Sequence, residues 1–321
     1  MSIVKIPFAR SYFTEAMIKN VTEEIGDAYR RGEMSNGESV RKLEERVAHI
    51  SGADYGVACG CCSIGLQIAI GASGVQGTGI TQSFTWDSTV IAINAVETGV
   101  HYLDIDYDRW TIKSFPAMPK AAYALAVDTF GMEFQPESRI PVFFDRAHSL
   151  GVKFRKLGMA SVLSFSPSKI CPGGEGGMIL TNKERYAEAY VNARNIISRM
   201  STANALTALE QLKVLPDLLD WKRETYAYYK QRLPEFKFQQ GEGNHQVIGC
   251  LADTNALRDR IMERTADHME LKAYYKPLHL RTNGTWNLPV TEDVAARIIC
   301  LPSWYGVDRD RVVELIREAM E

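Results

Sequence analysis

The 321-residue sequence has no long hydrophobic run, no excess of charge of one sign and no paired cysteines. No segment approaches the roughly 18 consecutive apolar residues of a membrane-spanning helix, and the first residues lack the apolar core of a secretory signal. We therefore expect a cytoplasmic protein. The 37 lysines and arginines nearly balance the 39 aspartates and glutamates, so charge gives no reason to expect nucleic acid or an anionic membrane as a partner. Six cysteines without CxxC spacing argue against a zinc site and a disulfide framework.

The first two thirds of the chain alternate helical and strand-like segments. Residues 12–50 place apolar residues three and four apart among charges, which predicts amphipathic helices. A strand ending near Ala58 precedes a buried helix, and such a strand, turn and helix unit directs backbone N–H groups toward an anion. Later strands are apolar throughout, which predicts an α/β fold with a mixed, mostly parallel sheet covered by helices on both faces. These runs are GTGITQSF, GVHYLDID, AAYALAVDTFG, IPVFFDRAH and ASVLSFS.

The last third changes character. Residues 184–235 are helical in pattern, and Pro216 should kink or divide the long second helix. Beyond it, a strand-like HQVIGCLA and a final helix DRDRVVELIREAME indicate a smaller α+β unit. We predict a large α/β domain over residues 1–215 and a small C-terminal domain over residues 216–321.

One stretch, SFSPSKICPGGEGGMI, places a single lysine, Lys169, after two serines and before a glycine-rich turn. A lysine in such a loop is commonly just solvated. Asp145, however, ends the buried strand PVFFD 24 residues earlier, and both side chains can project from the carboxyl edge of one sheet, where open α/β sheets bind ligands. A lysine that forms a Schiff base, an aspartate for a ring nitrogen and a phosphate-binding turn are what pyridoxal phosphate requires.

Blocks along almost the whole chain resemble one family in order and spacing. They include SNGESVRKLEERVAHISGADYGVACGCCSIGLQIAI, TQSFTWDSTVIAINAVETGVHYLDID and FFDRAHSLGVKFRKLGMASVLSFSPSKICPGGEGGMILTN. The sequence is similar to the DegT/DnrJ/EryC1/StrS aminotransferases, of which F-S-x-x-x-K followed by GEGG is a specific mark. The resemblance implies the fold of fold-type I pyridoxal-phosphate transferases and, for most members, amination of keto-sugars attached to nucleotides.

The resemblance also implies roles for individual residues. Lys169 would bond to the cofactor and move the proton, and Asp145 would partner the pyridine nitrogen. His148 would lie near the cofactor's O3′ and Trp86 would stack on its ring. Glu175 and His279 would approach the substrate. The residues implied to bind phosphate are Ser164, Ser63 and the backbone around Cys62.

Most of these assignments have a simpler alternative. Trp86 can be a core residue, because aromatic side chains bury large areas in any α/β protein. His148 can be a satisfied buried histidine, and Ser63 can be a helix N-cap, a role compatible with phosphate binding. Glu175 can merely shape its loop, and His279 can belong to the core or the surface.

The sequence departs from the family at three places. Cys61, Cys62 and Ser63 stand where a Ser-Gly-Thr turn is usual; the two cysteines are either incidental small residues or reactive thiols at a helix N-terminus, and we favour the former. Little room remains for a helix between the segments around residues 128–138 and 139–145, so one sheet face should be barer. The loop before Arg199 is nearly absent, and Ile197 occupies the position of an asparagine that relatives offer to the neighbouring subunit's phosphate.

These features predict a homodimeric, pyridoxal-phosphate-dependent aminotransferase with active sites near the subunit interface. L-glutamate is the expected amino donor, and a sugar or nucleotide-linked sugar is the expected keto or aldehyde acceptor. One alternative is a pyridoxal-phosphate-dependent decarboxylase or lyase acting on another substrate admitted by the shortened rim. The other is a non-catalytic, cofactor-binding regulatory protein, although a scaffold has no need for Lys169, Asp145 and a phosphate turn together. Lys169 argues against the dehydratase branch, which has histidine there.

Overall fold

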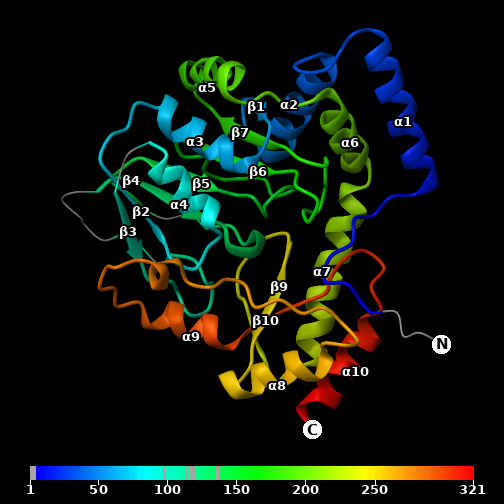
Figure 1. Cartoon of the computed structure of the whole chain (residues 1–321), viewed down its shortest axis with the longest axis vertical. Helices are drawn as coiled ribbons and strands as arrows, with labels where there is room; N and C mark the ends of the chain where they lie inside the picture. Colours follow the sequence, from blue (N-terminus) through cyan, green and yellow to red (C-terminus); the bar gives the residue numbers. More distant parts are fainter. Residues whose placement is uncertain (1–4, 97–98, 113, 116–120, 135–136) are drawn as a thin grey trace.

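Two sheets joined by one long helix organise the chain (Figure 1). The computed structural model describes residues 5–96, 99–112, 114–115, 121–134 and 137–321. The larger sheet has seven strands in the order β1-β7-β6-β5-β4-β2-β3, and β7 alone runs against the others. The strands of this sheet are β1 (Tyr55–Cys59), β2 (Thr78–Gln82), β3 (Val100–Leu103), β4 (Ala121–Val127), β5 (Val142–Asp145), β6 (Ala160–Ser164) and β7 (Gly177–Thr181).

Helices cover both faces of this sheet, and for that reason its strands are apolar throughout. Alternate residues of a strand point to opposite faces. In β7, Met178 and Leu180 join the core beneath one helical layer, whereas Ile179 joins the core on the other side. The helices of the first layer are α2 (Glu38–Ser51) and α6 (Thr202–Lys213), over which α1 (Glu15–Arg30) packs; those of the second are α3 (Cys62–Ala72), α4 (Asp87–Asn94) and α5 (Glu184–Ile197).

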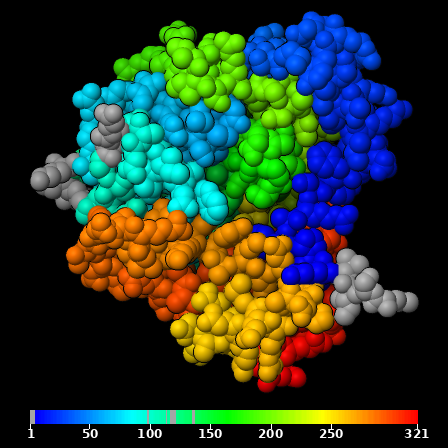
Figure 2. Space-filling view, in the orientation of Figure 1, coloured from blue at the N-terminus to red at the C-terminus, as the bar shows by residue number. Residues whose placement is uncertain are grey.

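The C-terminal part is built on a smaller antiparallel sheet of order β10-β9-β8. Helix α7 (Leu215–Arg232) runs from the large core, where Leu218 packs, to the small core, where Tyr229 packs. Figure 2 shows this C-terminal part, in yellow to red, lying against the cyan and green large part. Its other elements are β8 (Lys237–Phe238), β9 (Ile248–Leu251), β10 (Ile298–Leu301), α8 (Asn255–Thr265), α9 (Pro289–Arg297) and α10 (Arg309–Met320); short 3-10 turns are η1 (Thr129–Gly131) and η2 (Leu278–Arg281).

The predicted α/β class and mixed, mostly parallel sheet are confirmed. Pro216 divides the long helical stretch as expected, since α6 ends at Lys213 and Pro216 lies in the first turn of α7, where its missing N–H costs nothing. The sequence reading missed β8 and β10. The division into 1–215 and 216–321 stays a prediction; residues 6–8 already bond to His268 and Glu270 of the C-terminal part.

The two predicted shortenings differ in how far the structure describes them. Between β4 and β5, the turn η1 is the only helical piece within residues 128–134 and 137–141; residues 135–136 of this connection lie outside the described ranges. Between α5 and α6 only four residues, 198–201, intervene, and Ile197 is exposed. Within the described ranges, every helix is too short or too polar to cross a membrane.

Candidate active site

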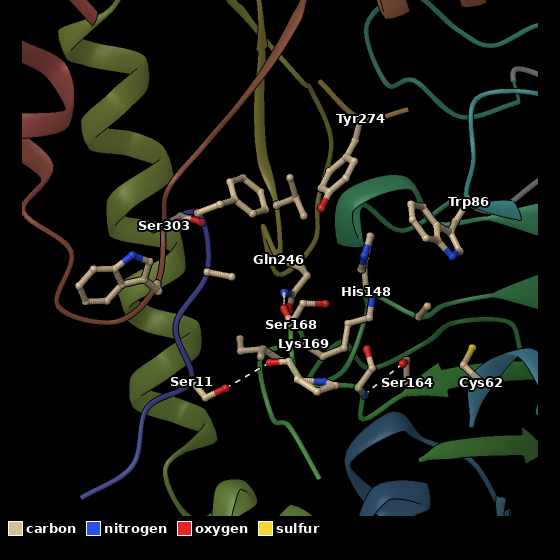
Figure 3. Close-up of a pocket in the computed structure, with 18 of the residues that line it drawn as sticks. Ser11, Cys62, Trp86, His148, Ser164, Ser168, Lys169, Gln246, Tyr274 and Ser303 are labelled. Atoms are coloured by element: carbon tan, nitrogen blue, oxygen red, sulfur yellow. Dashed lines mark hydrogen bonds between the residues drawn. The ribbon is translucent and has the colours of Figure 1, made fainter. Parts of the chain in front are cut away.

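A cavity of about 340 Å³ opens at the carboxyl ends of the central strands (Figure 3). Asp145 ends β5, Ser164 ends β6, and the N-termini of α3 and α4 face the same edge. Parallel strands place their carboxyl ends together, which is why residues distant in sequence meet here. The sequence-predicted residues that line the cavity are Lys169, Asp145, His148, Trp86, Ser164, Ser63, Cys62 and Glu175.

Lys169 lies in a tight turn between β6 and β7. Its backbone N–H donates to the carbonyl oxygen of Ser166 at 3.0 Å. The turn is held from outside by Ser11, whose hydroxyl donates to the Pro167 carbonyl, and by Gln246, whose amide donates to the Ser168 carbonyl. Burial lowers the pKa of the Lys169 amine, against the opposing charges of Asp145 and Glu175. A lowered pKa increases the fraction of neutral, nucleophilic amine near neutral pH.

Asp145 presents a buried carboxylate to the same cavity. One oxygen accepts the Thr89 hydroxyl at 2.8 Å, and the other accepts the backbone N–H of Ala147 at 3.2 Å. Burial raises the pKa of Asp145, whereas these two donors and the charge of Lys169 favour the ionised form. Each oxygen keeps acceptor capacity beyond its one bond. The carboxylate is therefore suited to hold a protonated ring nitrogen.

The N-terminus of α3 offers free backbone donors to the cavity. Cys61 is the N-cap, and its side chain makes no capping hydrogen bond, so the first N–H groups of the helix are left for another acceptor. Gly177 of β7 allows this close packing: a Cβ there would lie 2.7 Å from the carbonyl carbon of Cys61 and 2.8 Å from the nitrogen of Cys62. Ser63 and Ser164 border the same corner, and the Ser164 hydroxyl accepts the N–H of Ser166. This corner suits a phosphate.

His148 and Trp86 border the cavity on other sides. Burial and the charges of Lys169 and Lys222 hold the pKa of His148 well below its usual range, so the imidazole is neutral. Trp86 is 57% exposed and meets the rings of Tyr274 and Tyr275 edge-on. A core role for Trp86 is therefore wrong: its ring is at the cavity wall and remains available to a planar ligand.

Two residues assigned to the substrate differ in position. Glu175 lines the cavity and is exposed. His279 is outside the residues that line the cavity: it is buried, its Nδ1 lies 2.7 Å from the Ser83 hydroxyl, and its Nε2 lies 3.3 Å from Glu292. These contacts tie the turn η2 to the large sheet and place His279 apart from the cavity that the other site residues share. The sequence around His279 does not distinguish a substrate-binding role from a structural one.

Cys59 and Cys62, at the end of β1 and the start of α3, are both buried. All six cysteines of the chain are free. Burial raises the pKa of the Cys62 thiol well above its usual range, and burial likewise raises the pKa of Cys59 to about 12. Neutral buried thiols are unreactive. These pKa shifts support the interpretation that Cys62 and Cys59 are small packing residues.

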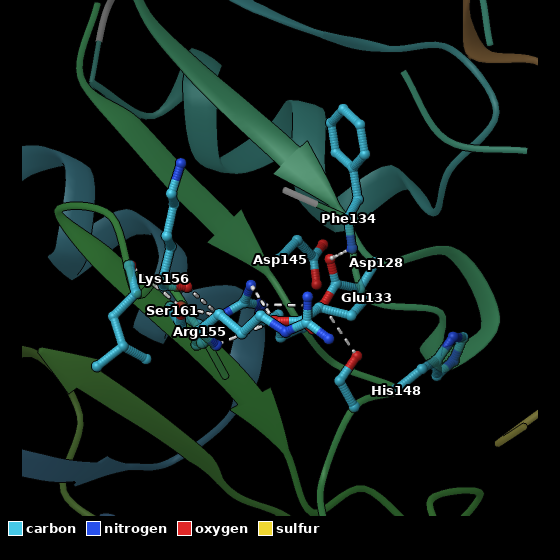
Figure 4. A network of polar contacts seen from close by, with 12 residues as sticks. Asp128, Glu133, Phe134, Asp145, His148, Arg155, Lys156 and Ser161 are labelled. Atoms are coloured by element: carbon cyan, nitrogen blue, oxygen red, sulfur yellow. Dashed lines mark hydrogen bonds and ion pairs between the residues drawn. The ribbon is translucent and has the colours of Figure 1, made fainter. Parts of the chain in front are cut away.

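A buried ion pair behind the cavity was not foreseen (Figure 4). The Arg146 guanidinium donates to Asp128 at 2.9 Å and lies between the rings of Phe144 and Phe154. Burial raises the pKa of Asp128 to about 6, with Arg146 opposing the shift. The backbone N–H of Asp128 donates to the Asp145 carbonyl. The pair thus fixes the ends of β4 and β5, and with them Asp145. The sequence offered no signal, because a strand-end aspartate is common.

Taken as a donor set, the cavity fits pyridoxal phosphate. Lys169 can attach an aldehyde, Asp145 can hold a protonated nitrogen, the α3 N-terminus can take a phosphate and Trp86 can cover a ring. Tyr274 and Tyr275 line the wall, and Thr89 holds the Asp145 carboxylate; all three were missed from the sequence. The signal that could have found Thr89 is its spacing of three residues after Trp86 on a helix facing the sheet edge.

Comparison with known proteins adds independent information. The model of the DegT/DnrJ/EryC1/StrS aminotransferase family matches residues 15–319. A putative pyridoxal phosphate-dependent aminotransferase EpsN of Bacillus subtilis is 24% identical over 91% of this chain and 91% of its own. A "pleiotropic regulatory protein" of Geobacillus stearothermophilus is 29% identical over 59% of this chain, and the match spans only 55% of that relative.

The fold has close counterparts among solved structures. DesI, whose structure was determined in the presence of its TDP-sugar product, superimposes with a TM-score of 0.88 at 26% identity, covering 100% of this chain and 95% of DesI. With the family model matching nearly the whole length, these findings confirm a pyridoxal-phosphate-dependent enzyme of fold-type I. The chain belongs to the DegT/DnrJ/EryC1/StrS aminotransferase family.

Proposed function

We propose that this aminotransferase moves an amino group from L-glutamate to the carbonyl carbon of a sugar linked to a nucleotide. The observation that carries the proposal is the burial of the Lys169 amine and the Asp145 carboxylate in one cavity beside the uncapped N-terminus of α3. The acceptor class is supported by DesI, which covers the whole chain and forms a TDP-sugar product.

Lys169, Asp145 and the N-terminus of α3 have distinct roles in the proposed reaction. Bound pyridoxal phosphate supplies an electron sink for the charge left when the donor loses its α proton. Lys169 removes that proton and returns it, a task suited to an amine whose pKa burial has lowered. Asp145 keeps the ring nitrogen protonated. Backbone N–H groups at Cys62 and Ser63 anchor the phosphate.

Two further side chains orient the planar ring. Trp86 covers one face, and the neutral His148 is placed to contact the polar edge of the ring. Ser164 adds a hydroxyl to the phosphate corner. None of these three moves a proton of the substrate, so their loss should weaken cofactor binding more than turnover.

The first prediction concerns the donor half of the reaction. Excess L-glutamate, added to the loaded enzyme without an acceptor, should bleach its yellow absorbance and release one equivalent of 2-oxoglutarate per active site. D-glutamate is the control and should leave the spectrum unchanged. Release of carbon dioxide in place of 2-oxoglutarate would instead establish the decarboxylase alternative, and a spectrum that ignores every amino acid would favour a regulatory role.

We also propose a homodimer with its active sites near the interface. Its support is that one chain leaves several large apolar side chains exposed, among them Ile91 of α4 and the neighbouring Ile196 and Ile197 at the end of α5. Apolar side chains that adjoin one another in solvent are typical of protein contacts. Sedimentation equilibrium should give twice the mass of one chain, and Ile91→Lys should lower this mass; a monomer at micromolar concentration would contradict the proposal.

A cytoplasmic location remains a prediction from the sequence.

A further inference from the structure

The cavity contains a second buried amine, Lys222, for which the mechanism above has no use. Lys222 lies in the middle of α7, where this helix passes between the two parts of the molecule, and it is 8% exposed. Its ammonium donates to the backbone carbonyl of Gln246 at 2.9 Å and to the Ser303 hydroxyl at 2.8 Å. Both partners are neutral. Across residues 5–96, 99–112, 114–115, 121–134 and 137–321, Lys222 has no ion pair with a carboxylate.

Lys222 and the reacting lysine line the same cavity and are linked through Gln246. Gln246, whose carbonyl holds the Lys222 ammonium, donates its side-chain amide to the Ser168 carbonyl at 2.9 Å, one residue before Lys169. Figure 3 shows Gln246 beside Ser168 and Lys169, with Ser303 on the same side of the cavity. The charges of Lys169 and Lys222 both lower the pKa of His148, in addition to its burial. A group bound to Lys222 would therefore lie in the cavity that contains the reacting lysine.

The Lys222 ammonium also has one N–H donor without a hydrogen-bond partner among the described residues. A charged ammonium has three N–H donors, and two are taken by Gln246 and Ser303. Burying an ammonium without a counter-charge is unfavourable, and burial accordingly lowers the pKa of Lys222 to about 7. A bound anion would supply the missing charge. An amino-acid donor carries a carboxylate next to its reacting carbon, whereas a nucleotide-linked sugar that is not a uronic acid carries its negative charge on the diphosphate.

The other charged groups that line the cavity are less suited than Lys222 to bind a carboxylate. Asp145 and Glu175 repel a carboxylate, Asp128 is paired with Arg146, and Lys169 is committed to the cofactor. Arg10 borders the cavity but is exposed and lies over the ring of Trp304. Resting on the proposed function, we propose that Lys222 binds a carboxylate of the amino donor and takes up a proton as it does so.

Proton uptake follows from the groups that face Lys222. Its titratable neighbours are His148 and His245, which burial and the charge of Lys222 both keep neutral because their pKa values are lowered, to about 4 for His245. Lys222 itself is the group that charges. Because its pKa is about 7 when free and rises when it is paired with an anion, Lys222 should take up most of a proton at pH 8 and little at pH 6.

The test uses glutarate, a dicarboxylate without an amine, so that binding is separated from amino transfer. Calorimetric titration of the cofactor-loaded enzyme in two buffers of different ionisation enthalpy gives affinity and proton uptake together. We expect Lys222→Met to weaken glutarate binding by about 10- to 100-fold and to abolish the uptake. Lys222→Arg should retain binding without uptake, because arginine is always charged. Lys230→Met, an exposed lysine on the same helix, is the matched control.

The outcomes distinguish this inference from its rivals. If Lys222→Met binds glutarate as well as the wild type does, the inference is wrong even where amino transfer proceeds. If glutarate binding requires Lys222 but the enzyme consumes no amino acid, the carboxylate site at Lys222 is supported and the proposed aminotransferase function is refuted. A purely structural lysine predicts lower thermal stability of Lys222→Met; we expect equal or higher stability, with the difference growing as pH falls from 10 to 7, since wild-type unfolding takes up a proton over this range and falling pH therefore favours the unfolded wild type.

Kinetics with two donors identifies the carboxylate. If Lys222→Met has a higher KM than the wild type for both glutamate and alanine, and its kcat changes less than about threefold, then Lys222 binds the α-carboxylate. A KM raised for glutamate alone places the side-chain carboxylate there. A loss of affinity for inorganic phosphate or for the cofactor, with the donor KM unchanged, would assign Lys222 to the phosphate and overturn the inference.

Discussion

Lys169→Ala should lower amino transfer at least about 10⁴-fold while leaving the fold intact. The substitution removes both the amine that attaches the cofactor and the group that moves the substrate proton. Among the described residues that line the cavity, the other lysine is Lys222, which is held by Gln246 and Ser303 on a different element and so is not placed to replace Lys169. Turnover is measured with saturating cofactor, so that weaker cofactor retention does not account for the loss.

Two further measurements make this result specific. Borohydride reduction of the loaded wild type should add the mass of the cofactor to the peptide that contains Lys169, and the variant should show no such addition. Lys230→Ala, exposed on α7, is the control and should behave as the wild type. A Lys169→Ala enzyme with more than a hundredth of wild-type turnover would refute the assignment.

Asp145→Asn should reduce kcat/KM at least about 100-fold while cofactor still binds. The amide preserves the size of the side chain; its oxygen can still accept from the Ala147 N–H, and its NH2 group can donate to the Thr89 hydroxyl oxygen, but it carries no charge to keep a ring nitrogen protonated. Because burial raises the pKa of Asp145, its charge opposes folding above that pKa. The variant should therefore unfold at the same or a higher temperature than the wild type near pH 7.

The combination of lost activity and retained stability separates a chemical from a structural role. Steady-state kinetics and thermal unfolding of the same preparation provide both numbers. Thr89→Val removes the hydroxyl that orients the carboxylate but leaves the charge, so its activity should lie between those of the wild type and Asp145→Asn. An Asp145→Asn enzyme that keeps half of the wild-type kcat/KM, or one that unfolds many degrees earlier, would contradict this account.

The residues near Lys169 and Asp145 were predictable because their signals are local. A strand that is apolar on both faces must be covered on both, and a polar residue at its carboxyl end must then face the ligand-binding edge of the sheet. Asp145 and Ser164 satisfy this rule at the ends of β5 and β6. Cys61 to Ser63 follow β1 directly and open α3, again a local pattern. Their roles toward the cofactor remain proposals that the variants above test.

His279 and Lys222 illustrate what local patterns miss. His279 resembled a site residue by position, but the packing of η2 against Ser83 places it in the core between the two parts. Lys222 lies in a helix of low amphipathicity among other charged residues, and nothing in the spacing distinguishes it from exposed Arg223 beside it. Only the crossing of α7 between the two sheets buries one and leaves the other in solvent.

The sequence by itself determined the α/β class, the mixed sheet, the break at Pro216 and the edge where the cavity forms. Each depends on hydrophobic period, on a proline's missing donor or on strand direction, which are properties of short segments. Only the tertiary structure decided which distant side chains share a dielectric environment: Arg146 with Asp128, Thr89 with Asp145, and Lys222 with Gln246 and Ser303. Burial and charge pairing between segments as far apart as 81 residues set the protonation of these groups, and no segment read alone contains that information.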